Sequence, residues 1–300
     1  MANLPNNNFT TNTLSLHAGY EYDRQRTLSV PIYQSTAYSF ENAEQAAARF
    51  SLEELGNIYS RLTNPTVDML AKRIAAVEGG AFGVATASGS SAVFYSLVNL
   101  AQNGDNIAYS NKIYGGSQTL LVHVLKRFGI EGRVFDIDNL SSLEKIIDDK
   151  TKAIFFESLS NPQIAIADVE TITNIAKKHK IVTICDNTVA TPILFRPFDF
   201  GVDVSVHSLT KYINGHGSGL GGAVIEREGL NELIKDNSRY PAFNTPDESY
   251  HGLIYANLPL PIFSIRILIE WLRNIGASLS PQNAWIHFQG LETLELRIQK

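Results

Sequence analysis

A lysine in distinctive surroundings lies within residues 205–217. Lys211 follows the hydroxyl residues Ser208 and Thr210 and precedes a glycine-rich turn, and an apolar, strand-like segment, residues 202–206, comes before them. Because side chains alternate along an extended segment, the two hydroxyls can face one ligand. A lone lysine is most often a solvated surface charge, but an amine in apolar surroundings can act as a nucleophile. The spacing favours a chemical role for Lys211.

Other polar residues follow strand-like segments in the same way. Gly89 and Ser90 open a predicted helix, where free backbone N–H groups and the helix dipole suit a phosphate. Asp186 and Thr188 come directly after a strand, which either directs the carboxylate toward a ligand or begins an ordinary turn. Asn161 lies in an Asn-Pro pair of the kind that forms turns. Taken singly, each of these motifs has an ordinary structural explanation.

The elements that must position these residues alternate regularly after residue 80. Strands are predicted at residues 82–87, 106–109, 134–137, 153–157, 181–185, 202–206 and 223–225, and helices at residues 90–101, 117–128, 140–147 and 169–179. This alternation predicts an α/β domain with a mostly parallel sheet and helices on both faces. In such sheets ligands bind beyond the carboxyl ends of the strands, where Lys211, Asp186 and Gly89 fall.

The two ends of the chain show less regular patterns. We expect a short helix at residues 43–50 and a longer one that starts at Asn64-Pro65 and stops at Gly79-Gly80. Residues 1–12 are expected to be poorly ordered, and the remainder of the first 60 residues to form an arm on the main body or on another subunit. Helices are also expected at residues 263–275 and 281–300.

Composition excludes several classes of protein. Hydrophobic residues make up 44% of the chain and charged residues 18%, which indicates a soluble globular protein. The net charge is −5 and the basic residues are scattered, so a nucleic-acid partner is not expected. The most apolar late segment, residues 253–272, is interrupted by Asn257, Pro259, Pro261 and Arg266, so a membrane span is not expected either.

The cysteine and histidine residues indicate the cellular compartment and whether a metal is expected. Cys185 is the only cysteine, so the chain cannot form an internal disulfide and a reducing compartment is expected. Residues 1–13 lack the basic start and apolar run of a signal peptide, which points to the cytoplasm. The histidines at positions 207, 216 and 251 lack metal-site spacing, so no metal is expected.

Residues 217–222 match the pattern G-x-G-x-x-G. A dinucleotide-binding site needs a strand before this pattern and a helix after it. Here a strand, residues 223–225, is predicted to follow, so a nicotinamide site is rejected.

Taken together, the residues at the predicted strand ends fit pyridoxal 5′-phosphate. The amine of Lys211 can form a Schiff base with its aldehyde, and the carboxylate of Asp186 can keep its pyridine nitrogen protonated. Tyr114, at another strand-to-helix junction, can stack on its ring. The donors available for its phosphate are Gly89, Ser90, Ser208 and Thr210.

The chain resembles the Cys/Met-metabolism family of pyridoxal-phosphate enzymes, which have the aspartate-aminotransferase-like fold. The similar segments, in the family's order, are residues 59–66, 88–89, 114–115, 157–162, 186–188 and 205–217. The resemblance implies that Lys211 is the Schiff-base lysine, that Asp186 pairs with the pyridine nitrogen and that Asn161 meets the ring oxygen. Tyr114 would stack on the ring and assist proton transfer, and Thr188 belongs to the same cofactor-binding set.

The resemblance also implies an oligomer. In the family, the equivalents of Tyr59 and Arg61 reach the phosphate in the neighbouring subunit, so the arm would complete a shared site. The planar fork of an arginine suits that task. The implied assembly is a homodimer with shared sites, within a homotetramer.

Residues 55–61 and 113–117 look most like those of O-acetylhomoserine sulfhydrylases. Methionine-degrading γ-lyases tend to have a cysteine where this chain has Gly116. The implied reaction is a γ-replacement, in which O-acetyl-L-homoserine and a sulfur nucleophile give L-homocysteine and acetate. Cystathionine synthesis and γ-elimination on the same scaffold stay open, as does a truncated, inactive chain that binds cofactor.

The resemblance divides the chain into three parts. Residues 1–60 would be the arm that contributes to the neighbouring subunit, residues 61–255 the large cofactor-binding domain, and residues 256–300 the start of a connecting helix and C-terminal domain. Family chains continue into a small C-terminal domain with an arginine for the substrate carboxylate. We therefore expect that this chain stops within that domain.

Overall fold

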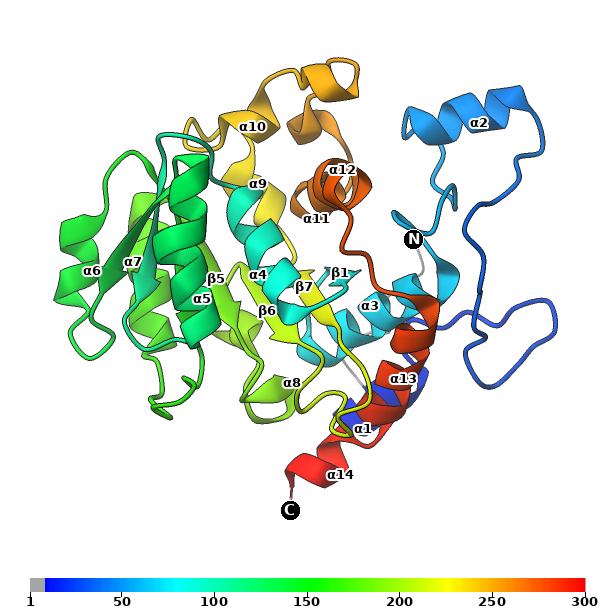
Figure 1. Cartoon of the computed structure of the whole chain (residues 1–300), viewed down its shortest axis with the longest axis horizontal. Helices are drawn as coiled ribbons and strands as arrows, with labels where there is room; N and C mark the ends of the chain where they lie inside the picture. The colour runs from blue at the N-terminus through cyan, green and yellow to red at the C-terminus, as the bar shows by residue number, and fades with distance from the viewer. Residues whose placement is uncertain (1–8, 300) are drawn as a thin grey trace.

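A single seven-stranded sheet forms the centre of the computed structural model, which describes residues 9–299 (Figure 1). The strands are β1 (Phe82–Thr86), β2 (Asn106–Ser110), β3 (Glu131–Phe135), β4 (Thr151–Glu157), β5 (Val182–Asp186), β6 (Val204–Ser208) and β7 (Gly222–Glu226). Their order across the sheet is β1-β7-β6-β5-β4-β2-β3. The β2–β6 block is parallel and β7 runs antiparallel to both of its neighbours, which confirms the predicted mostly parallel α/β fold.

The helices lie on both faces of this sheet, as the alternation predicts (Figure 1). They are α1 (Thr11–His17), α2 (Ala43–Phe50), α3 (Pro65–Glu78), α4 (Gly89–Val98), α5 (Gly115–Thr119), α6 (Ser141–Ile146), α7 (Val169–His179), α8 (Thr191–Leu194), α9 (Leu230–Ile234), α10 (Pro241–Asn244), α11 (Ile262–Arg266), α12 (Arg273–Ile275), α13 (Pro281–Glu292) and α14 (Leu294–Ile298). A π-helical segment, Leu120–Val124, continues α5, and another, Ile267–Leu272, joins α11 to α12. None of the described helices is long and apolar enough to cross a membrane.

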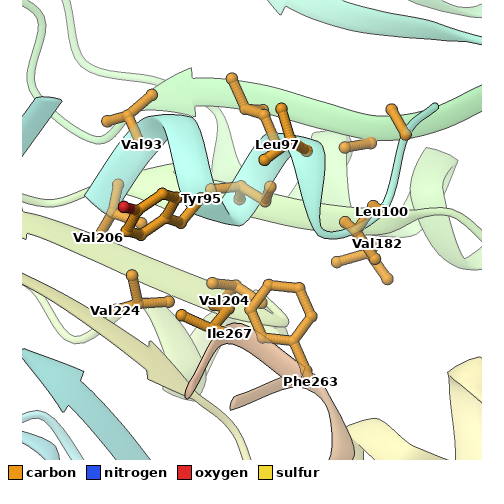
Figure 2. Close-up of a cluster of buried hydrophobic side chains, with 14 of the residues drawn as sticks. Val93, Tyr95, Leu97, Leu100, Val182, Val204, Val206, Val224, Phe263 and Ile267 are labelled. Carbon is orange, nitrogen blue, oxygen red and sulfur yellow. The ribbon is translucent and has the colours of Figure 1, made fainter. Parts of the chain in front are cut away.

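One face of the sheet packs against α4 and the segment from α11 to α12. Figure 2 shows this core, in which Val204 and Val224 from the strands meet Leu97 from α4 and Phe263 from α11. All four side chains are almost completely buried. Burial of apolar side chains on this scale is the main source of stability in such a domain.

The opposite face is covered by two groups of helices. α3 and α13 pack over the β1–β7 end, and α6 and α7 over the β3–β4–β5 end. Consecutive residues of β4 show the division, because Phe155 belongs to the α4 face and Phe156 to the α7 face. Side chains of a strand alternate between faces, so β4 is apolar on both sides, as a buried parallel strand must be.

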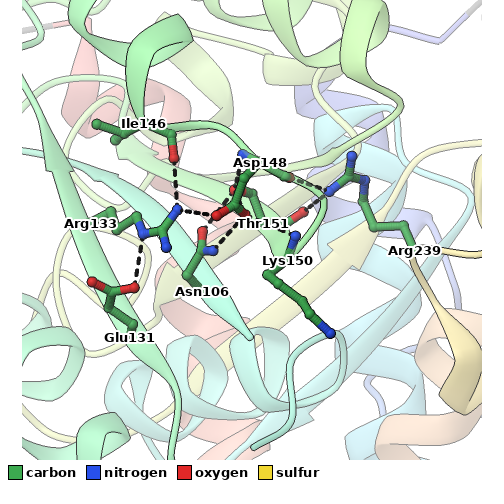
Figure 3. A network of polar contacts seen from close by, with 8 residues as sticks. All are labelled: Asn106, Glu131, Arg133, Ile146, Asp148, Lys150, Thr151 and Arg239. Atoms are coloured by element: carbon green, nitrogen blue, oxygen red, sulfur yellow. Dashed lines mark hydrogen bonds and ion pairs between the residues drawn. The ribbon is translucent and has the colours of Figure 1, made fainter. Parts of the chain in front are cut away.

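A polar network fixes the amino ends of β2, β3 and β4 (Figure 3). The carboxylate of Asp148 accepts hydrogen bonds from Arg133 at 2.6 Å, from Asn106 at 2.8 Å and from the backbone of Lys150 at 2.8 Å. Burial opposes ionisation, but these donors lower the pKa of Asp148 to about 2. The network therefore stabilises the edge of the sheet that lies opposite to the predicted ligand edge.

Several expected boundaries differ from the structure. β3 begins at Glu131, three residues earlier than predicted, and β6 continues to Ser208, two residues further than predicted. Residues 11 and 12, expected to be poorly ordered, begin α1, while residues 1–8 lie outside the described part. α1 is held by the buried Arg73, which donates to the carbonyl of Ala18 at 2.8 Å. A contact across 55 residues of chain leaves no local sequence signal.

The turn after β6 is held by the last helices of the chain. Residues 209–214 form this turn, and a Cβ built on Gly290 of α13 would overlap the carbonyl oxygens of Ile213 and Asn214. Arg297 of α14 also donates to the carbonyl of Tyr212 at 2.7 Å. The segment that carries Lys211 therefore depends on packing with residues about 80 positions later.

Gly290→Ala is expected to lower the free energy of unfolding by about 1–3 kcal/mol, because the added methyl group meets backbone atoms that cannot move aside easily. In an unhindered helix the same substitution would stabilise by about 1 kcal/mol, so the sign is diagnostic. Urea unfolding followed by circular dichroism measures it. Gln289→Ala, at an exposed position of the same helix, is the control. Equal unfolding midpoints for the two variants would contradict the proposed close packing.

Candidate active site

The carboxyl ends of the strands bring the predicted site residues to one edge of the sheet. Glu157 at the end of β4 pairs in register with Asp186 at the end of β5. Ser208 at the end of β6 pairs with Gly222 of β7, which also pairs with Thr86 at the end of β1. Residues at equivalent positions of neighbouring parallel strands point to the same face. The expected edge of the sheet is therefore the edge at which these polar groups lie.

Asp186 and Ser208 are connected through Thr188. The backbone N–H of Ser208 donates to Oγ1 of Thr188 at 2.8 Å, and that hydroxyl donates to Oδ1 of Asp186 at 2.6 Å. The backbone N–H of Thr188 also donates to the same oxygen at 3.0 Å. Burial raises the pKa of Asp186, and the Thr188 donors oppose that rise. Only Oδ1 is used by these bonds, so Oδ2 is available to a ligand.

The amino end of α4 closely approaches Ser208. A Cβ built on Gly89 would lie 2.5 Å from Cβ of Ser208, so only glycine fits at this position without a shift. Ser88 and Ser91 form a capping box, which uses their hydroxyls within the helix cap. The backbone N–H groups of Gly89 and Ser90 precede the first intrahelical bonds and remain free for an anion.

Lys211 lies in the turn directly after β6. Its backbone N–H donates to the carbonyl of Ser208 at 3.2 Å, which keeps the turn close to the strand end. Its side chain is exposed in the single chain, and among the described residues it makes no ion pair. Thr210 is engaged differently, because its hydroxyl donates to the carbonyl of Gly221 at 3.3 Å and accepts from the N–H of Gly221 at 3.1 Å. Its proton is therefore already used, whereas the hydroxyl of Ser208 makes no hydrogen bond among the residues that the structure describes.

Glu157 joins two other predicted site residues. Its Oε1 accepts from the backbone N–H of Tyr114 at 2.6 Å, and its Oε2 accepts from the backbone N–H of Asn161 at 2.9 Å. Burial, followed by the neighbouring charge of Asp186, raises the pKa of Glu157 to about 7. Two acids side by side at this edge favour a cationic group between them.

Tyr114 directly precedes α5, beside which a cavity lies. The ring lies over Gly116, where a built Cβ would overlap it, and half of the side chain is exposed. The cavity has a volume of about 400 Å³ and is lined by Ser90 of α4 together with residues of α5 and the segment after it, among them Gly115 and Ser117. The cavity therefore lies beside the amino ends of α4 and α5, and Tyr114 directly precedes α5.

Tyr59 and Arg61 are not joined to this group within the described residues of the single chain. They lie in the segment before α3, where the guanidinium of Arg61 lies 5.0 Å from the ring centroid of Tyr59. Both side chains are exposed. Their predicted role toward a neighbouring subunit stays a prediction.

Glu157 is the site residue that the sequence analysis missed. It ends the predicted strand 153–157 and begins the family-like segment 157–162, but no role was assigned to its side chain. The signal that could have identified it is its position, since it ends a strand as Asp186 and Ser208 do. Among residues 9–299 no cluster of His, Cys, Asp and Glu is suited to a metal ion.

The donor set fits pyridoxal 5′-phosphate. Free N–H groups at α4 and the Ser208 hydroxyl suit a phosphate, and the free oxygen of Asp186 suits a protonated ring nitrogen. The close approach of Gly89 to Ser208 forms a cradle that a larger residue at position 89 would fill. Lys211, which carries the amine for the Schiff base, lies in the turn that follows Ser208.

A family model described as "Cys/Met metabolism PLP-dependent enzyme" matches residues 12–300. The chain belongs to this family. Pyridoxal 5′-phosphate is therefore its cofactor, and the fold that the resemblance implied is confirmed. β7 begins at Gly222, so a strand and not a helix follows the glycine pattern, as predicted.

Individual relatives agree with this assignment. O-acetyl-L-homoserine sulfhydrylase of Corynebacterium glutamicum is 44% identical over 292 residues, which cover 96% of this chain and 67% of that protein. A crystal structure of a putative O-acetylhomoserine (thiol)-lyase from Campylobacter jejuni, with N′-pyridoxyl-lysine-5′-monophosphate, is 69% identical with a TM-score of 0.96, and the match covers 97% of this chain and 72% of that one. Cystathionine gamma-lyase from Lactobacillus plantarum, complexed with L-serine, is 31% identical with a TM-score of 0.76, covering 96% and 65%.

Glu157→Gln is expected to weaken the binding of pyridoxal 5′-phosphate about tenfold, because an amide has one acceptor oxygen and its NH₂ group would face one of the two N–H groups. Either Tyr114 or Asn161 then loses its backbone anchor. Titration of cofactor-free protein with pyridoxal 5′-phosphate, followed by visible absorbance, measures the dissociation constant. Glu170→Gln, on the exposed side of α7, is the control. A dissociation constant equal to that of the control would count against the anchoring role.

Proposed function

We propose that the protein catalyses the γ-replacement of O-acetyl-L-homoserine, with a sulfur nucleophile, to L-homocysteine and acetate. The observation that carries the proposal is the grouping of Lys211, Asp186, Ser208 and the amino end of α4 at one sheet edge. Support comes from relatives named O-acetyl-L-homoserine sulfhydrylase at 39–44% identity, among them those of C. glutamicum and Leptospira meyeri. With sulfide, the acetate group leaves Cγ with its bonding electrons, sulfur forms a bond to Cγ, and the two protons of hydrogen sulfide end on the acetic acid and the thiol.

We assign the cofactor contacts as follows. The N–H groups of Gly89 and Ser90 and the hydroxyl of Ser208 hold the phosphate, and the Asp186 carboxylate pairs with the ring nitrogen. The cofactor, when bound, supplies an electron sink for negative charge that develops on the substrate carbons. Thr188 orients Asp186 through the bonds to Oδ1.

The proton transfers belong to Lys211 and Tyr114. Nζ of Lys211 would accept the Cα proton of the substrate and pass protons between neighbouring substrate carbons. The Tyr114 ring stacks over the site and its hydroxyl assists these transfers, while Glu157 anchors the Tyr114 backbone. Asn161, anchored by the same carboxylate, meets the ring oxygen. Thr210 has a smaller part in holding the phosphate because Gly221 uses its hydroxyl proton.

We also propose a homo-oligomer with shared active sites. Tyr59 and Arg61 are exposed and lie outside the strand-edge group, which suits a role toward a second copy of the chain. The same proposal divides the chain into an arm, a large domain and a C-terminal segment, with boundaries near residues 60 and 255. It also includes a cytoplasmic location.

Lys211→Ala is expected to abolish the visible absorption band that the wild-type chain gives with pyridoxal 5′-phosphate, and to lower turnover by at least about 100-fold. Borohydride treatment of the wild-type chain should attach the cofactor to the peptide that contains Lys211, which mass spectrometry of a digest can locate. Lys145→Ala, at an exposed position of α6, is the control. An unchanged band in Lys211→Ala would refute the assignment of this lysine.

Incubation of the 300-residue chain with O-acetyl-L-homoserine is expected to yield homocysteine when sulfide is present. Parallel reactions with cysteine and with no nucleophile separate the alternatives, because cystathionine would indicate synthase chemistry, and an oxo acid with ammonia would indicate γ-elimination. Chromatography of the products measures all three reactions. Cofactor binding without any product would favour the alternative of an inactive cofactor-binding chain.

A further inference from the structure

A polar network lies inside the molecule behind the proposed active site. Its centre is Glu78, the last residue of α3, which is completely buried. One oxygen, Oε1, accepts from Nε2 of His207 at 2.8 Å, from Nδ2 of Asn187 at 2.9 Å and from Oγ of Ser205 at 3.0 Å. Asn187 in turn accepts from the hydroxyl of Ser158 at 2.7 Å. A single carboxylate oxygen therefore links the ends of β4, β5 and β6.

Three members of this network are direct sequence neighbours of proposed site residues. Ser158 follows Glu157 and Asn187 follows Asp186. The backbone ladder continues through both, because Ser158 N–H donates to the Asp186 carbonyl at 3.1 Å and Asn187 N–H donates to the Val206 carbonyl at 3.0 Å. Consecutive residues of a strand face opposite sides, so one face carries the site and the other carries the network.

His207 of β6 is the third network residue that is a sequence neighbour of a proposed site residue. It precedes Ser208, and its side chain is 0% exposed, as is that of Glu78. Burial alone would lower the pKa of His207, but the charge and hydrogen bond of Glu78 raise it. The two side chains therefore form a buried, hydrogen-bonded pair of a carboxyl and an imidazole at the back of the sheet.

Burying the polar groups of this network costs desolvation free energy that apolar side chains would not cost. Oε2 of Glu78 and Nδ1 of His207 are buried and have no hydrogen-bond partner within residues 9–299. A buried ion pair is weak support for stability, and apolar residues of similar volume often stabilise as well or better. The network around Glu78 therefore contributes more by fixing the positions of the strand ends than by raising the free energy of unfolding.

We propose that Glu78 is a positioning residue, which sets the spacing of Glu157, Asp186 and Ser208 by binding their strands from behind. This inference rests on the proposed cofactor site. Loss of Oε1 would free the ends of β5 and β6 to shift relative to each other and to β4. The phosphate contact at Ser208 and the ring contact at Asp186 would then no longer be held at the distance that the cofactor requires.

Glu226 provides a matched control. It is a buried carboxylate of β7 that accepts from the N–H and hydroxyl of Ser264 at 2.8 and 2.7 Å. It pairs with Val204 at the beginning of β6 and with Phe82 at the beginning of β1, at the edge remote from the site. Its loss should therefore disturb the core without moving the strand ends.

The test compares Glu78→Ala, Glu78→Gln and Glu226→Ala in the chain as it exists. The dissociation constant for pyridoxal 5′-phosphate and the visible circular dichroism of the bound cofactor are measured, together with the urea unfolding midpoint. Glu78→Ala is expected to weaken cofactor binding about tenfold or more and to change the dichroism band. Glu226→Ala is expected to lower the unfolding midpoint but to bind cofactor as the wild type does.

Glu78→Gln separates position from charge. An amide oxygen in place of Oε1 can still accept from His207, Asn187 and Ser205, and the amide nitrogen replaces an oxygen that has no partner. This variant is expected to retain wild-type affinity within about threefold, a difference of less than the roughly 1.4 kcal/mol that a tenfold change represents. Rescue by glutamine would not follow from a purely electrostatic role.

Two results would overturn the inference. One is a cofactor affinity in Glu78→Ala equal to that in Glu226→Ala, and the other is an affinity in Glu78→Gln as weak as that in Glu78→Ala. If Glu78→Ala does not fold, Asn187→Ala removes the link to β4 and β5, and an unchanged affinity there would overturn it equally. Failure of the wild-type chain to bind the cofactor would refute the proposed site and, with it, this role of Glu78.

Discussion

The parallel pairing of β4, β5 and β6 is the constraint on which the site depends. It places Glu157 beside Asp186 on one face of the sheet. Burial raises the pKa of both carboxyls, and the neighbouring charge of Asp186 raises the pKa of Glu157 further. The arrangement is unfavourable for the isolated chain and becomes favourable when a cationic ligand lies between the strand ends. The register of β4 and β5 therefore positions the site residues and lowers the free energy of unfolding of the isolated chain.

The two faces of the sheet have different roles, one toward the ligand and one toward the core. The front face presents the groups that would touch a ligand, and α4 supplies free N–H groups there. The back face carries the network around Glu78, packed under α3. The turn that holds Lys211 depends on a third element, because α13 and α14 pack against it. Elements far apart in the sequence therefore determine the geometry of one small region.

This division explains what the sequence could predict. Asp186, Ser208 and Gly89 were identifiable because each follows or ends an apolar strand, which is a local pattern. The anchoring by Glu157 was not identifiable, since its partners Tyr114 and Asn161 are set by the order of strands across the sheet. The same holds for the α1 anchor at Arg73 and for the engagement of Thr210 by Gly221. Long-range contacts leave no periodic signal in one sequence.

The glycine pattern at residues 217–222 shows why a motif must be interpreted with its neighbours. A Cβ on Gly222 would overlap the carbonyl oxygen of Ser88, just before α4, and one on Gly221 would overlap the ring of His287 in α13. These glycines allow β7 to pass close to the amino end of α4 and to the helix behind it. A dinucleotide motif uses glycine to admit a ligand's phosphate to the backbone. Here glycine admits neighbouring elements instead, and the free N–H groups for a phosphate lie at Gly89 on a different strand end.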